Sequence, residues 1–118
     1  MNDITIYHNP RCSKSKATLE LITSMGITPI VKLYLEEKIS HDELSNVLTK
    51  LNIKPRELLR KTESLYKKHD LDNNILDDSE IIKLMIENPI LIERPIVIRN
   101  KRAIIGRPPE NVLRIIKK

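Results

Sequence analysis

The chain has 118 residues, enough for one domain whose hydrophobic core needs neither disulfides nor a metal ion to hold it together. Its single cysteine excludes an internal disulfide and a cysteine-based zinc site, and its three scattered histidines show no metal-ligand spacing. The net charge of +5 suits a small anionic substrate, whereas the lack of Trp and Phe argues against the base-stacking platforms of nucleic-acid-binding proteins. We therefore expect no bound metal or other cofactor and no nucleic-acid partner.

The amino-terminal residues show no targeting signal. No basic region followed by a long apolar stretch is present there, and no apolar run approaches the roughly 20 residues of a membrane-spanning helix. We expect a cytoplasmic, thiol-reducing setting and no membrane partner.

The first third of the sequence predicts a β-α-β unit. Residues 4–7 form a short apolar run, residues 13–25 carry apolar side chains at helical spacing, and residues 30–35 form a second apolar run. Gly26 lies where a helix commonly ends in a left-handed backbone conformation. Units of this kind place their two strands in parallel.

The middle of the sequence predicts a block of helices. Ser40 and Asp77 are each followed three positions later by a glutamate, the pattern of a capping box at a helix start. Pro55 suits the first turn of a further helix that ends near Arg60. A short helix is expected at 64–68, and the polar stretch that follows it is expected to be a loop.

The last third predicts a β-hairpin and a final helix. Apolar runs at 96–98 and 103–105 flank a polar turn in which Asn100 tolerates a positive φ angle. Pro108-Pro109 then opens the last helix.

The order of these elements predicts the fold class. We expect an α/β protein, a thioredoxin-like fold with a helical insertion at about residues 40–90 between its β-α-β and β-β-α halves. The whole chain, residues 1–118, is expected to form a single domain.

Cys12 is the residue most suggestive of chemistry. It lies between the first strand and the first helix, where unpaired backbone N–H groups and the positive end of the helix lower the pKa of a thiol and attract anions. Arg11, Lys14 and Lys16 add positive charge, and His8 adds more when it is protonated. The alternative interpretation is a small buried hydrophobe without reactivity.

Ser15 restricts the redox chemistry that is open to Cys12. It occupies the position, three residues after the thiol, where a dithiol oxidoreductase carries its second cysteine. Because serine cannot resolve a mixed disulfide, any redox cycle of Cys12 needs a thiol from outside the chain.

Three arginines are candidates for holding an anion. Arg94 precedes Pro95 at the expected start of the third strand, and a cis bond there would place Arg94 close to the Cys12 loop; the alternative is an ordinary trans proline at a sheet edge. Arg60 and Arg107 are less specific on their own. A guanidinium donates two parallel hydrogen bonds to a tetrahedral oxyanion, so three arginines converging on a thiolate would bind an ion the size of arsenate or phosphate. The competing interpretation is three unrelated surface arginines.

Three separated motifs stand out, together with the single residue Arg60: His8-Asn9-Pro10-Arg11-Cys12-Ser13-Lys14-Ser15, Arg94-Pro95-Ile96-Val97 and Gly106-Arg107-Pro108-Pro109-Glu110. Together they resemble the glutaredoxin-linked arsenate reductase family, and the resemblance covers nearly the whole chain, from about residue 4 to residue 116. The short length and the Pro-Pro-Glu motif are similar to the compact bacterial members of that family.

The resemblance implies a function and a set of roles. Cys12 is implied as the nucleophile that attacks the arsenic of arsenate, and His8 as the residue that assists its ionisation. Arg60, Arg94 and Arg107 are implied as the oxyanion ligands. The implied reductant is glutathione, and the implied protein partner is glutaredoxin, which clears the mixed disulfide as arsenite leaves.

Two other interpretations remain open from the sequence. Spx-type regulators, a related branch, bind RNA polymerase, but they usually carry a Cys-x-x-Cys switch that Cys12-Ser13-Lys14-Ser15 lacks. A glutathione-dependent thiol transferase without an oxyanion substrate would also need only the thiol of Cys12.

Overall fold

A computed structural model of the chain describes residues 3–72 and 75–116. The chain divides into two compact units. The first unit consists of Met1–Glu37 and Arg94–Lys118, and the second unit is Lys38–Glu93. The assignment of both to a single domain stays a prediction.

The first unit is built on a four-stranded mixed sheet. Its strands are β1 (Ile4–Tyr7), β2 (Ile30–Lys32), β3 (Ile96–Arg99) and β4 (Arg102–Ile105), in the order β2-β1-β3-β4. β1 runs parallel to β2 and antiparallel to β3, and β3 runs antiparallel to β4. The hairpin between β3 and β4 turns at Asn100, whose φ angle is +56°, as predicted. The structure confirms the α/β, thioredoxin-like order of elements.

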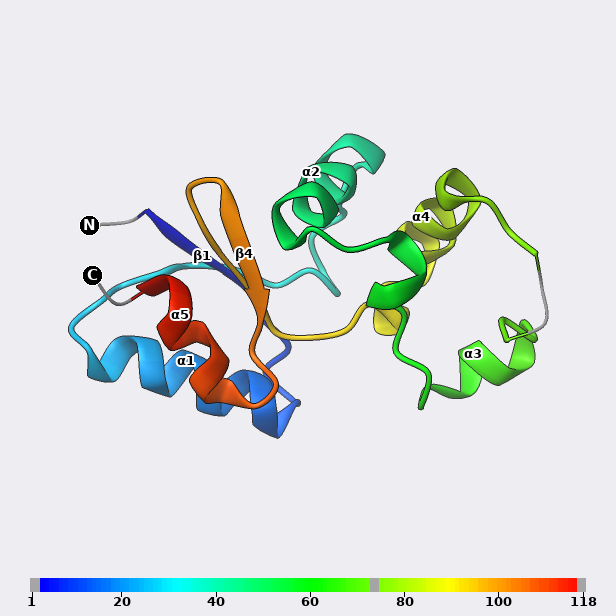
Figure 1. Cartoon of the computed structure of the whole chain (residues 1–118). Coiled ribbons are helices and arrows are strands. Elements are labelled where there is room, and N and C mark those ends of the chain that lie inside the picture. Colours follow the sequence, from blue (N-terminus) through cyan, green and yellow to red (C-terminus); the bar gives the residue numbers. More distant parts are fainter. Residues whose placement is uncertain (1–2, 73–74, 117–118) are drawn as a thin grey trace. The chain divides into compact units, whose positions relative to one another are not determined.

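Helices cover one face of this sheet, where the core of the first unit lies. They are α1 (Ser13–Ser24), the 3-10 helix η3 (Pro109–Val112) and α5 (Leu113–Ile116), and Figure 1 shows α1 and α5 on the same side of the sheet. Alternation along the strands sends β-branched side chains to that face. The buried cluster consists of Ile4, Ile6, Ile22, Val97, Val112, Ile115 and Ile116. This packing fixes the amino-terminal end of α1 beside the end of β1.

The second unit is helical. Its elements are α2 (His41–Leu51), the 3-10 helix η1 (Pro55–Leu58), α3 (Ser64–Lys68), α4 (Asp78–Glu87) and the 3-10 helix η2 (Pro89–Leu91). The Ser40 side chain accepts a hydrogen bond from the N–H of Glu43, which starts α2 where the sequence predicted. Asp77 and Glu80 form a complete capping box at α4, also as predicted. No helix of the described residues is long and apolar enough to cross a membrane.

The predicted second strand is too long. β2 ends at Lys32 rather than at residue 35, because the chain turns at Leu33. The carbonyl of Leu33 accepts hydrogen bonds from the N–H groups of Glu36 and Glu37, and the N–H of Leu33 donates to Glu37 Oε2. A local turn therefore replaces the last half of the apolar run.

The prediction of a helix from Pro55 to near Arg60 is also wrong, both in the type of helix and in its length. The segment is a single 3-10 turn, and Leu59 leaves it to form an antiparallel bridge with Ile92. The N–H of Arg60 donates to the carbonyl of Leu91 at 2.7 Å. Pairing with a distant segment, rather than helix propensity, decides the conformation around Arg60.

The capping box gives a stability prediction. Replacing Asp77 by Ala leaves the Glu80 N–H without its acceptor, so we expect the free energy of unfolding to fall by about 1 kcal/mol. Urea unfolding followed by circular dichroism measures this. Asp78→Ala is the matched control, since it removes a carboxylate from the first turn of α4 and leaves the cap in place. Equal losses in the two variants would contradict the assigned role of the cap.

Candidate active site

Cys12 occupies the N-cap of α1. Its backbone is extended, with φ −96° and ψ 122°, and its side chain is buried. The first turn of α1 contains two lysines and no carboxylate, so the positive end of the helix is not compensated there. The backbone N–H groups of Ser15 and Lys14 face the sulfur and favour its ionised form.

Two opposed effects set the pKa of the Cys12 thiol. Burial raises the pKa, and the backbone N–H of Ser15, the side chain of Arg94 and the backbone N–H of Lys14 lower it. The lowering effects prevail, so the pKa of Cys12 lies below its ordinary value. A lowered pKa favours the thiolate and supports the prediction of a reactive thiol over that of an inert buried hydrophobe.

Two arginines from distant parts of the sequence meet the thiol. Arg94 is 7% exposed, and its guanidinium lowers the pKa of Cys12 by hydrogen bonding and by charge. Arg107 donates from its second terminal nitrogen to Cys12 Sγ at 3.6 Å, and its Nε donates to the backbone carbonyl of Arg94 at 2.8 Å. The peptide bond from Arg94 to Pro95 is cis.

His8 is hydrogen-bonded to Ser15, near the start of α1. Its Nδ1 lies 2.6 Å from Ser15 Oγ, and the N–H of Asn9 donates to the same oxygen at 3.0 Å. Burial lowers the pKa of His8, which favours the neutral ring at pH 7. Since Ser15 also presents its N–H to Cys12, this serine connects the ring to the sulfur. The implied part of His8 in ionising the thiol stays a prediction.

Arg60 lies in the second unit, where two carboxylates hold it. Its Nε pairs with Glu63 at 3.0 Å, and its NH1 nitrogen pairs with Glu93 at 2.9 Å. Burial lowers the pKa of Arg60, but the two carboxylates raise it more, so the guanidinium stays charged. The implied role of Arg60 as an oxyanion ligand stays a prediction.

Sequence reasoning missed several residues that build the site. It treated Ser15 only as a missing second thiol, whereas the structure shows Ser15 as a hydrogen-bonding centre. Asn9 Oδ1 accepts from the N–H of Arg11 at 3.0 Å, and the carbonyl of Asn9 accepts from the N–H of Cys12. The Asn-Pro pair was a usable signal for this turn, because Asn side chains commonly bond the backbone two residues on.

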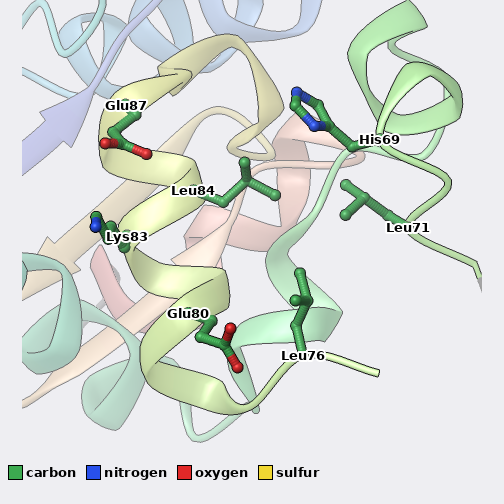
Figure 2. A pocket seen from close by; sticks show the side chains of 7 residues that line it. All are labelled: His69, Leu71, Leu76, Glu80, Lys83, Leu84 and Glu87. Carbon is green, nitrogen blue, oxygen red and sulfur yellow. The ribbon is translucent and has the colours of Figure 1, made fainter. Parts of the chain in front are cut away.

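A separate hollow of about 360 Å³ lies within the second unit. Figure 2 shows the histidine, leucine and charged side chains that line it: His69, Leu71, Leu76, Glu80, Lys83, Leu84 and Glu87. The hollow contains no thiol. Among the residues that the structure describes, no group of three or more His, Cys, Asp or Glu side chains could hold a metal ion.

The arrangement around Cys12 places a thiol with a lowered pKa beside two guanidinium groups. A thiolate carries the electron pair, and two guanidinium groups beside it are the best side-chain match for a tetrahedral oxyanion. The arrangement therefore suits an oxyanion placed next to the sulfur of Cys12.

Comparisons with known proteins agree with this chemistry. A sequence model of the ArsC family matches residues 7–115. An arsenate reductase from Haemophilus influenzae is 48% identical over 114 residues, which cover 96% of this chain and 98% of that protein. An arsenate reductase from Escherichia coli is 44% identical over 116 residues, which cover 98% of this chain and 82% of that protein. The structure of an arsenate reductase from Vibrio cholerae matches with a TM-score of 0.92 at 46% identity, over 96% of this chain and 97% of that one.

The contacts of Cys12 predict how the alkylation rate of its thiol depends on pH. We expect its iodoacetamide alkylation rate to rise at a lower pH than that of a reference cysteine peptide, because only the thiolate reacts. Arg94→Met removes a cation that favours the thiolate, so the midpoint should move to higher pH. Arg11→Met is the control, since this exposed arginine is next to Cys12 in sequence and solvent screens its charge. A wild-type midpoint at or above that of the peptide contradicts the assignment, as does an equal shift in both variants.

Proposed function

This chain belongs to the ArsC family, and from that premise we propose that it is an arsenate reductase whose nucleophile is Cys12. One observation carries the proposal: a thiol with a lowered pKa lies against the guanidinium groups of Arg94 and Arg107. An oxyanion substrate explains why two cations face a sulfur that becomes an anion.

The proposed reaction begins with binding of the arsenate oxygens by Arg94 and Arg107. The Cys12 thiolate attacks arsenic, a sulfur–arsenic bond forms, and an arsenate oxygen leaves as water after taking up protons. The two guanidinium groups balance the negative charge that gathers as two anions approach each other. In this scheme His8 and Ser15 keep the helix end in place behind the sulfur.

Reduction of arsenic needs two electrons, and we propose that two thiols supply them. Glutathione provides the second thiol, arsenite leaves, and Cys12 and glutathione are left as a mixed disulfide. Since the chain has one cysteine, a thiol of glutaredoxin restores Cys12 by attack on that disulfide. This requirement for reduced thiols is the reason we propose a cytoplasmic setting without a bound cofactor.

The first test of the proposal is arsenate-dependent NADPH oxidation in an assay coupled through glutathione, glutaredoxin and glutathione reductase. We expect turnover by the wild type, none above background by Cys12→Ser, and a loss of turnover when glutaredoxin is omitted. Turnover no greater than that of Cys12→Ser would falsify the reductase. Activity on a small mixed disulfide alone, without arsenate turnover, would identify a thiol transferase instead.

The family resemblance supports a further proposal, that Arg60 contributes a third guanidinium for the oxyanion. Glu63 and Glu93 then compete with the substrate for it, because each already occupies one of its N–H donors. Hydrogen bonds to charged groups contribute about 1.5–3 kcal/mol, which sets the size of the effect on binding.

Kinetics of Arg60 variants test this role. We expect Arg60→Ala to raise KM for arsenate roughly tenfold or more, following from the loss of a charged hydrogen bond. Glu93→Gln should lower KM, because it removes a competing carboxylate. Arg102→Ala, at an exposed hairpin arginine, is the control for a general loss of positive charge. An unchanged KM in Arg60→Ala would leave Arg60 as a structural residue of the second unit.

A further inference from the structure

We propose that Thr18 is a positioning residue whose buried side chain, packed against Gly106, sets the distance between the Cys12 thiol and the Arg107 guanidinium. Thr18 lies in α1, six residues after Cys12, and is 0% exposed. It touches neither the thiol nor the proposed oxyanion ligands in any bond that the structure describes, so it acts through its neighbours.

The hydroxyl of Thr18 lies between two chain segments. It donates to the carbonyl of Lys14 at 2.8 Å, within the first turns of α1, and it lies 3.4 Å from the carbonyl oxygen of Gly106. The bond to Lys14 satisfies a polar group that burial would otherwise penalise. The Thr18 side chain therefore connects α1, whose N-cap is Cys12, to Gly106, the residue before Arg107.

Gly106 approaches Thr18 too closely to allow any side chain. A Cβ atom added at Gly106 would lie 2.7 Å from Thr18 Oγ1, 3.1 Å from Thr18 Cγ2 and 2.9 Å from Pro95 Cγ. Distances this short require a displacement, and both neighbours are packed inside the molecule. The N–H of Gly106 also donates to the carbonyl of Pro95 at 2.9 Å. Thr18, Pro95 and Gly106 thus meet at one point with no spare room.

This three-way contact lies one residue away from both arginines of the site. Pro95 directly follows Arg94, and Gly106 directly precedes Arg107. Arg107 is held to Arg94 by the 2.8 Å bond from its Nε, and it reaches Cys12 Sγ at 3.6 Å. Because the interaction of two charges weakens with their separation, a shift of the Gly106 backbone away from α1 weakens the hold of Arg107 on the thiolate.

A purely structural role makes a different prediction. If Thr18 and Gly106 only fill the core, changes there reduce thermal stability but leave the pH dependence of thiol reactivity unchanged. If they set the spacing, changes there reduce thiol reactivity even in protein that is fully folded. A compensating pair of substitutions should then restore part of it.

The test compares iodoacetamide alkylation of Cys12 against pH in folded full-length variants. In Gly106→Ala we expect the rate at pH 7 to fall about threefold and the midpoint to move to higher pH, because only the ionised thiol reacts. The double variant Thr18→Ala/Gly106→Ala removes the two short contacts with Thr18 and leaves the one with Pro95 Cγ, so we expect it to recover part of the rate lost in Gly106→Ala. Thermal unfolding of each variant confirms that the measured protein is folded.

Gly26→Ala is the matched control. Gly26 ends α1 with φ +78°, where an added Cβ meets nothing within 4 Å, so this change strains the backbone without touching the contact. We expect Gly26→Ala to lose stability while its alkylation profile stays that of the wild type. An unchanged profile in Gly106→Ala, the same loss in Gly26→Ala, or no recovery in the double variant overturns the proposal. If Gly106→Ala does not fold, Thr18→Ala replaces it: we expect the loss of the Thr18 side chain to loosen the contact and lower the alkylation rate, and a wild-type profile in Thr18→Ala overturns the proposal.

Turnover supplies a second readout that rests on the proposed function. We expect kcat/KM for arsenate to follow the alkylation rate across the same variants. Should the wild type reduce no arsenate while the alkylation pattern holds, the proposed function fails and the positioning role of Thr18 stands. Should arsenate turnover be normal in every variant and alkylation be unchanged, the positioning role fails and the proposed function stands.

Discussion

The site depends on one electrostatic balance at the sulfur of Cys12. Burial opposes ionisation of the thiol, while the first N–H groups of α1 and the Arg94 side chain favour it. Each of these groups would serve an incoming oxyanion equally well. We therefore propose that the groups that favour the Cys12 thiolate also bind the oxyanion substrate.

The topology of the first unit brings these groups together. β1 leads into the loop before Cys12, the chain re-enters the unit at Arg94 just before β3, and Arg107 follows β4. Since β3 lies between β1 and β4, the segments that carry Cys12, Arg94 and Arg107 converge at one end of the sheet. The tight contact between Thr18, Pro95 and Gly106 limits how closely those segments can approach, and the hydrogen bond from the Gly106 N–H to the Pro95 carbonyl holds two of them together.

The sequence predicted the features that arise locally. The strand-turn-helix setting of Cys12, the caps at Ser40 and Asp77, and the positive φ of Asn100 all follow from short-range patterns. What it missed comes from pairings between distant residues. The bridge between Leu59 and Ile92 replaces the predicted helix, and the contact between Thr18 and Gly106 spans 88 positions. Of the two carboxylates that hold Arg60, Glu93 was equally invisible because it is 33 positions away, whereas Glu63 lies only three positions away.

The most direct test of the account is a crystal of the protein soaked with arsenate, with the arsenic located from its anomalous scattering. We predict arsenic bonded to Cys12 Sγ, with its oxygens contacting the guanidinium groups of Arg94 and Arg107. Arsenic bound elsewhere, or a fully occupied ion that leaves the sulfur and both guanidinium groups untouched, would contradict it.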